Sequence, residues 1–153
     1  MGVAPDLALQ MRIAVEFDAP RVVVDGPLGG RRVLHVTSGT FEGVALRGEV
    51  LPGGGDWLVA RRDGSIELDI RFTLRTVEDE IIYFRGAGLF LASEAITARI
   101  RSGESVPADQ YYFRTAVLFE AGSARLSHLN QALHVGVGQR TAGGMITDVY
   151  SVS

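Results

Sequence analysis

The sequence contains no cysteine and no lysine, and both absences narrow the chemistry that is open to the protein. Without cysteine, disulfides, thiolate nucleophiles and cysteine-bound metal clusters are excluded. All 15 basic residues are arginine, so Schiff-base catalysis through a lysine amine is excluded as well. Arginine stays protonated at working pH, so it can bind anions or polarise oxygens but is a poor proton carrier. Acid or base catalysis therefore falls to His, Asp, Glu or Tyr.

Strong net charge and long apolar runs are also missing. The formal net charge is −3 with acidic and basic residues interspersed, so there is no basic stripe of the kind that binds phosphates or anionic membranes. No apolar run reaches the roughly 18 residues of a transmembrane helix. Asp6, Gln10 and Arg12 interrupt the segment where a signal peptide would need its apolar core. We expect a soluble, cytoplasmic protein that binds neither nucleic acid nor membranes.

The most regular stretch of the chain is GSIELDIRFTLRT, residues 64–76. Apolar side chains from Ile66 to Leu74 alternate with polar ones from Glu67 to Arg75, which is the period-2 pattern of a half-buried β-strand. The chain of 153 residues fits one domain, residues 1–153, and its 46% of apolar residues can supply a core. A long alternating strand in such a domain favours a sheet that coils into a barrel.

Similar patterns predict further strands and a single helix. The predicted strands are 9–17, 21–24, 31–36, 44–51, 56–62, 81–84 continuing after a break at Arg85-Gly86 into 88–91, 111–120, 133–137 and 145–152. Asp63-Gly64 predicts a hairpin turn before the central strand. Ser93 and Gly103 predict the two ends of a short helix over 94–101. Since no βαβ units occur, the fold class is all-β, an antiparallel barrel of about eight to ten strands with one short helix.

Several ordered motifs are similar to those of a known family. They are GTFEG (39–43), LRGEVLPGGGDW (46–57), RDGSIELDIRFTLRT (62–76), YYFRT (111–115), FE (119–120), LSHLN (126–130) and VGVGQR (135–140). Over about residues 8–152 the chain resembles the bacterial and fungal family catalogued as domain of unknown function 3237, which includes UPF0311 proteins. The resemblance implies an antiparallel barrel similar to that of allene oxide cyclase and a homo-oligomer, with a dimer as the first expectation. It implies no settled reaction and no agreed catalytic residues.

The chain departs from the family pattern in two places. Relatives typically carry an aromatic residue in a segment YSWLN, where this chain has LSHLN with His128. Relatives read DGAXI after the central strand, where this chain has Glu78-Asp79-Glu80-Ile81. His128 is either an acid or base with a pKa near physiological pH, or a side chain that fills the space of the aromatic residue.

Alternation also suggests which polar side chains meet. Asp69 and Arg71 lie either on the solvated face of the central strand or inside the barrel. Tyr112, Arg114 and Glu120 share one parity along their strand. We predict that Asp69, Arg71, Arg114 and His128 converge at one end of the barrel interior, with Tyr112 and Glu120 nearby. The alternative is an internal ion pair that fixes strand register.

Metal and phosphate sites are not expected. His35, His128 and His134 lack the spacing of metal ligands, and neither HxH nor HExxH occurs. The glycines of LPGGGDW lead into a strand, so no helix N-terminus follows that would hold a phosphate. Asp56 and Trp57 can stand at the barrel mouth and orient a ligand, although Trp57 suits the core equally well.

These residues support two hypotheses. The first is a cofactor-free enzyme, an isomerase, cyclase or lyase that acts on a small carbonyl or polyene compound in the barrel. Its catalytic residues would be His128, Asp69 or Glu120 for proton transfer and Arg71 or Arg114 for the developing negative oxygen; Trp57, Tyr83, Tyr112, Asp56 and Asn130 would contact the substrate. The second is a non-catalytic barrel that binds a small ligand or has a structural role. An inward His or carboxylate with a strongly shifted pKa favours the enzyme, whereas a dry, apolar interior favours the second hypothesis.

Overall fold

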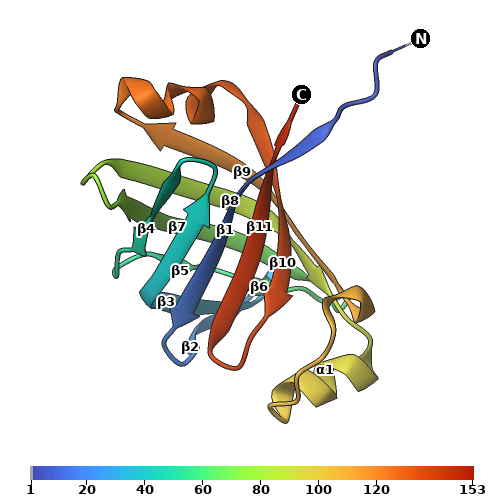
Figure 1. The fold of residues 1–153 in the computed structure, drawn as a ribbon. Helices are drawn as coiled ribbons and strands as arrows, with labels where there is room; N and C mark the ends of the chain where they lie inside the picture. The colour runs from blue at the N-terminus through green and yellow to red at the C-terminus, as the bar shows by residue number, and fades with distance from the viewer. Residues whose placement is uncertain (1) are drawn as a thin grey trace.

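The computed structural model describes residues 2–153 and shows an antiparallel β-barrel (Figure 1). Its strands are β1 (Leu7–Phe17), β2 (Arg21–Gly26), β3 (Gly29–Gly43), β4 (Leu46–Val50), β5 (Gly55–Asp56), β6 (Val59–Ala60), β7 (Ile66–Thr76), β8 (Ile81–Leu91), β9 (Tyr112–Ala121), β10 (Leu133–Arg140) and β11 (Gly144–Val152). The helical segments are α1 (Glu94–Arg101) and the 3₁₀ segments η1 (Ala108–Gln110) and η2 (Ala124–Gln131). The predicted domain also includes Met1, which lies outside the described residues.

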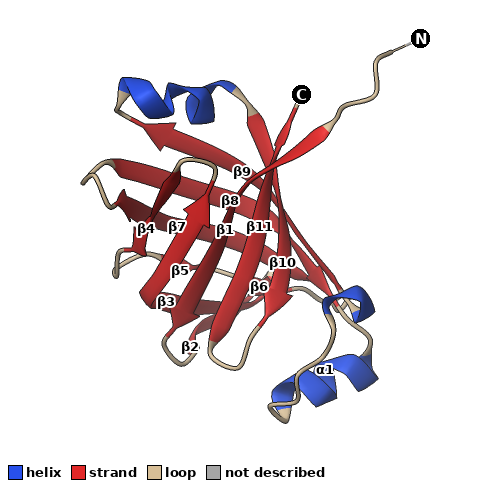
Figure 2. Cartoon of the chain, viewed as in Figure 1, coloured by secondary structure: helices blue, strands red, loops and turns tan. Residues whose placement is uncertain are grey.

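Eight strands close the barrel in the order β1, β11, β10, β9, β8, β7, β4 and β3, because β3 pairs again with β1. The remaining strands β2, β5 and β6 lie off this path. Strands dominate the chain (Figure 2), and the predicted antiparallel barrel is confirmed. The predicted helix has the predicted bounds: Ser93 Oγ accepts a hydrogen bond from the Ile96 N–H at 3.2 Å, and Gly103 adopts a φ of 85° after its end. None of the helices within residues 2–153 is long and apolar enough to cross a membrane.

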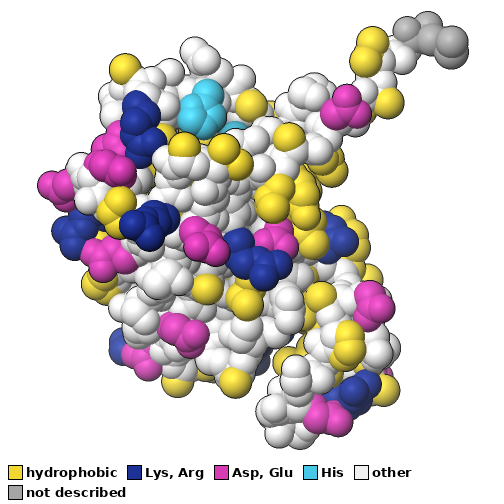
Figure 3. Space-filling model, viewed as in Figure 1, with side chains coloured by type: hydrophobic (Ala, Val, Ile, Leu, Met, Phe, Trp, Pro, Cys, Tyr) yellow, Lys and Arg dark blue, Asp and Glu magenta, His cyan; other side chains and the backbone are white. Residues whose placement is uncertain are grey.

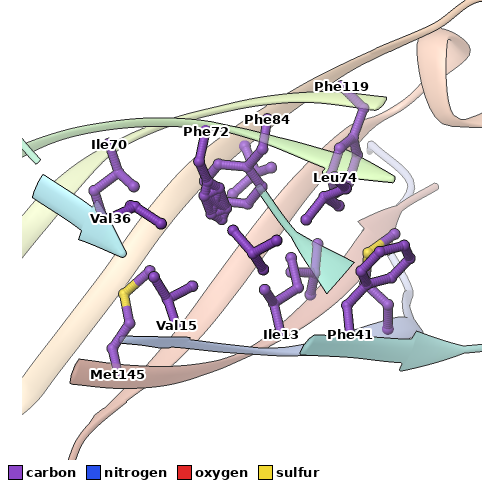
Figure 4. Close-up of a cluster of buried hydrophobic side chains, with 14 of the residues drawn as sticks. Ile13, Val15, Val36, Phe41, Ile70, Phe72, Leu74, Phe84, Phe119 and Met145 are labelled. Carbon is purple, nitrogen blue, oxygen red and sulfur yellow. The ribbon is translucent and has the colours of Figure 1, made fainter. Parts of the chain in front are cut away.

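The core lies along the barrel axis and is built around β7. Leu68, Ile70, Phe72 and Leu74 point inward and are buried, as their alternation predicts. The Phe72 and Phe84 rings lie 4.2 Å apart at their centres, and Phe119 meets Phe84 edge-on at 5.6 Å. Side chains from opposite walls point toward these rings (Figure 4). Glycine at residue 86 leaves room for the Phe84 ring, since a Cβ there would lie 2.9 Å from that ring and displace it. The middle of the barrel is therefore filled.

One end of the barrel is closed by η2, which crosses it (Figure 1). Leu126 and Leu129 point from η2 into the core and are 1% and 0% exposed. The Asn130 side chain holds this segment to β9, since its amide donates to the Ala121 carbonyl at 2.8 Å and accepts from the Ala121 N–H at 2.6 Å. The two leucines supply the apolar plug that closes this end.

An ion pair attaches η2 to the turn between β7 and β8. Arg125 reaches Glu80 at 2.6 Å and donates to the Ala45 carbonyl at 2.8 Å. Glu80 also accepts hydrogen bonds from Ser123 and Thr76. The Arg125 hydrogen bond, followed by that of Ser123, lowers the pKa of Glu80 to about 2. The acidic segment that departs from the family pattern thus anchors η2.

Three predicted strands differ from those observed. β3 continues through residues 38–43, and β8 runs unbroken through Arg85-Gly86 because it pairs with β7 and β9 along its length. The predicted strand 56–62 is instead two short strands. Between these two strands the ladder with β7 is interrupted, and here the Asp69 N–H donates to the Asp56 side chain at 3.1 Å. The Trp57 carbonyl accepts from Arg31 at 2.8 Å. The buried Asp56 carboxylate thus accepts a backbone hydrogen bond of β7 within the barrel wall.

Candidate functional site

The barrel opens at the end opposite η2, where β1 ends and β11 begins. The last pair between these strands is Glu16 with Gly144, followed by a hydrogen bond from the Phe17 N–H to the Gly143 carbonyl at 2.9 Å. Beyond this point residues 18–20 and the turn 141–143 border a cavity of about 340 Å³. Its walls are mainly apolar and include Leu34, Leu58, Leu68, Phe90, Phe113 and Met145. A cavity of this size and lining suits one small molecule.

Asp56 is the buried ionisable group of this cavity. Its side chain lines the wall, and the residue is only 5% exposed. Burial raises the pKa of Asp56 from its ordinary 3.8 to about 6, because the charged form loses its hydration. The neighbouring Asp69 charge acts in the same direction, whereas the Asp69 N–H and the positive charge of Arg140 oppose the shift. Asp56 therefore changes its protonation state close to neutral pH.

Arg140 provides the positive charge of the same cavity. As the last residue of β10 it lines the opening, and its N–H donates to the Tyr111 hydroxyl at 2.8 Å. Its Cζ lies 5.9 Å from the centre of the Phe90 ring, a cation–π contact. The residue as a whole is exposed, yet the guanidinium side that faces the protein is desolvated, and this lowers the pKa of Arg140. Within residues 2–153, Arg140 forms no ion pair.

Together these groups place a proton-exchanging carboxyl and a guanidinium on the walls of one apolar cavity. A carboxyl with a pKa of about 6 can take or return a proton near neutral pH. A guanidinium can stabilise negative charge on a ligand oxygen, more strongly in apolar surroundings than in water. In the part of the chain that the structure describes, no three His, Asp or Glu side chains gather as metal ligands would.

The predicted convergence of Asp69 and Arg71 inside the barrel is wrong. Both side chains lie on the outer face of β7, where they pair with each other at 3.2 Å and are 41% and 51% exposed. The alternation allowed either face of β7 to point into the barrel. The apolar face points inward because its burial removes far more apolar surface from water. The outer face carries a further charged pair, Arg75 with Glu49. On the face of the molecule drawn in Figure 3, acidic and basic side chains are likewise interspersed.

The other predicted catalytic residues lie outside the barrel too, so their convergence in the interior is also wrong. Arg114 lies on the outer face of β9, 5.6 Å from the centre of the Tyr112 ring. Glu120 is exposed on the same strand, since Phe113, Thr115, Val117 and Phe119 take the inward positions. His128 is exposed on η2, whose inward positions belong to leucines. The positions of Arg114, Glu120 and His128 give no support to the catalytic roles suggested for them.

The residues predicted to contact a substrate divide among three places. Asp56 lines the end cavity, as expected of a residue at the barrel mouth. Trp57 borders an outer groove together with Asp69 and Arg71, and it meets His35 edge-on at 6.4 Å. The remaining residues lie elsewhere on the surface: Tyr83 and Asn130 border a hollow beside η2, and Tyr112 is 51% exposed.

Sequence reasoning missed Arg140 and the two aromatic walls Phe90 and Phe113. Arg140 ends the motif VGVGQR, and the last residue of a strand at an open barrel end is well placed to reach a ligand. His134 was also missed as an interior residue. It is 2% exposed, burial lowers its pKa, and its Nδ1 has no hydrogen-bond partner in the described chain.

The fold and its cavity define a class of protein, the small closed antiparallel barrel with one plugged end and one open end. Within that class, the chain belongs to the family described as protein of unknown function (DUF3237), whose model matches residues 5–152. It is 30% identical to a UPF0311 protein of Clostridium acetobutylicum over 142 residues, which cover 92% of this chain and 90% of the relative.

Solved structures share the fold. A conserved protein of unknown function from Rhodopseudomonas palustris superposes with a TM-score of 0.92 at 26% identity, with 100% of both chains covered. A protein from Penicillium herquei described as an enzyme superposes with a TM-score of 0.75, covering 100% of this chain and 98% of that one. Its 15% identity shows a common fold alone.

Proposed function

We propose that the protein is a cofactor-independent enzyme that moves a proton on a small, largely apolar carbonyl or polyene compound bound in the end cavity. The observation that carries this proposal is the buried Asp56, whose pKa of about 6 lies near working pH. Ionisation of a buried carboxyl lowers the stability of the folded protein. A carboxyl of this kind in a ligand-sized cavity is typical of a functional acid or base. That a Penicillium herquei protein of this fold is described as an enzyme supports the proposal at the level of fold.

The proposed chemistry uses two charged groups of the cavity, Asp56 and Arg140. Ionised Asp56 takes a proton from the carbon next to a carbonyl, and the electron pair of that C–H bond moves to the carbonyl oxygen. Arg140 stabilises the resulting enolate oxygen. Asp56 then returns the proton to another carbon of the conjugated system, which completes an isomerisation. In a lyase, the enolate instead expels a leaving group, which departs with the proton from Asp56. No external oxidant or reductant is required.

Deuterium exchange tests this step without knowledge of the natural substrate. A panel of small apolar ketones, such as tetralones and cyclohexenones, is incubated with the protein in deuterium oxide and followed by NMR. Ketones that bind are expected to exchange their acidic C–H positions, with a rate that rises through about pH 6 as Asp56 ionises. Asp56→Asn should lower that rate by about 10²- to 10⁴-fold, the usual contribution of a general base, while ligand binding persists.

The matched control is Glu120→Gln, which changes an exposed carboxylate on β9 and should leave exchange unchanged. The competing hypothesis, a non-catalytic binding barrel, predicts ketones that bind in the cavity and exchange equally slowly with the wild-type protein and with Asp56→Asn. That result would overturn the enzyme proposal.

A further inference from the structure

Strand β2 presents an unpaired edge outside the closed barrel. It pairs with β3 along one side, from Arg21 with Val33 to Gly26 with Gly29. On its other side no strand of residues 2–153 pairs with it. The valines at 22, 23 and 24 are 66%, 58% and 54% exposed. An exposed apolar edge strand is a template for pairing with another chain, and proteins usually protect such edges.

The centre of this edge is Val23. The register with β3 passes from Val22 directly to Val24, so Val23 is the extra residue of a β-bulge and has no partner in β3. The extra residue of a bulge leaves the regular ladder, so its backbone groups remain available. The strand therefore has an uncommitted backbone position in the middle of its three valines.

The residues on either side of the valines carry opposite charges. Arg21 precedes them and Asp25 follows them, both exposed, and neither forms an ion pair within the described chain. When two copies of β2 run antiparallel about a two-fold axis at Val23, Arg21 of each copy faces Asp25 of the other, and Val22 faces Val24. Opposite charges placed directly across an antiparallel pair stabilise it, and like charges destabilise it. An edge that is protected against self-pairing carries like charges at positions that would face each other. The segment RVVVD, residues 21–25, instead places opposite charges at those positions.

We propose that β2 pairs antiparallel with β2 of a second copy of this chain, so that the two sheets join across a two-fold axis at Val23. The interface is isologous, since each copy contributes the same strand. Residues 18–20, which border the cavity, lead directly into β2 (Figure 1), so each cavity mouth lies beside the interface.

Charge exchange tests the proposed register. Sedimentation equilibrium over nanomolar to high micromolar concentrations should show a dimer for the wild-type protein. Arg21→Asp and Asp25→Arg each place like charges opposite one another at two symmetric positions, and each should raise the dimer dissociation constant by at least about tenfold. The double variant Arg21→Asp/Asp25→Arg exchanges the charges and should restore the wild-type constant. Arg47→Asp makes the same charge change at an exposed position on β4 and should have no effect.

Three outcomes overturn the proposal. The first is a wild-type protein that stays monomeric at every concentration. This includes a monomer that sediments with phosphatidylglycerol vesicles, which would mean that β2 and β3 bind a membrane instead. The second is an oligomer whose dissociation constant neither single variant changes, which would place the interface on another face. The third is a double variant as weak as the single ones, since only mutual pairing of the two charges predicts recovery. Circular dichroism verifies that each variant is folded.

Discussion

Replacing Asp56 with asparagine is expected to raise the free energy of unfolding at about pH 8 by about 2 to 3 kcal/mol. The pKa of Asp56 is about 6 in the folded protein and near 3.8 in the unfolded chain. Between these values the folded state binds the additional proton, so stability falls as pH rises from 3.8 through about 6. Asparagine never ionises, and its side-chain oxygen can still accept the hydrogen bond from the Asp69 N–H.

Urea unfolding at about pH 4 and about pH 8 measures this difference. The two proteins should be nearly equally stable at the lower pH, where Asp56 is protonated, and should diverge at the higher pH. Asp109→Asn, at an exposed position of η1, should change stability by less than about 0.5 kcal/mol at both. An Asp56→Asn protein less stable than wild type at the higher pH would show that the carboxylate is well accommodated in its site.

The largest loss of stability is expected from Phe84→Ala. Phe84 is 1% exposed, and its ring packs between Phe72 and Phe119 in the middle of the barrel. Gly86 beside it has no side chain to move into the vacated space. Truncation should therefore leave a cavity and lower the free energy of unfolding by about 3 to 5 kcal/mol.

The matched control for this variant is Leu91→Ala on the same strand, where the side chain is 49% exposed. Its effect should stay below about 1 kcal/mol. Denaturant unfolding of both variants against the wild type supplies the comparison. A loss below about 1 kcal/mol for Phe84→Ala would mean that the barrel centre is loosely packed, contrary to the filled interior described above.

The fold could be predicted because its signals are local. The alternation from Ile66 to Leu74 requires one buried face, and Ser93 with Gly103 determines the ends of α1 through capping. Strand ends were less certain, since β8 passes through Arg85-Gly86 only because β7 and β9 pair with it on both sides. Such pairing involves residues far away in the sequence, and a local pattern cannot show it.

The site was harder to predict for a related reason. Alternation places Asp69 and Ile70 on opposite faces of β7 but does not show which face points into the barrel. The apolar face points inward because its burial removes more apolar surface from water. Asp56 points into the cavity because it lies opposite the inward-facing Ile70 of β7, and its side chain also accepts a hydrogen bond from the Asp69 N–H. Arg140 joins it from a strand more than 80 positions later, and only the closure of the barrel brings the two together.

The central claim is that Asp56 is a buried carboxyl poised to exchange a proton near neutral pH. Carbon-13 NMR of protein labelled at the aspartate side-chain carboxyls tests it most directly, with the Asp56 signal assigned by its loss in Asp56→Asn. The account predicts that this signal titrates with a midpoint at about pH 6. A midpoint at or below 3.8, the ordinary value of an exposed aspartate, would contradict it.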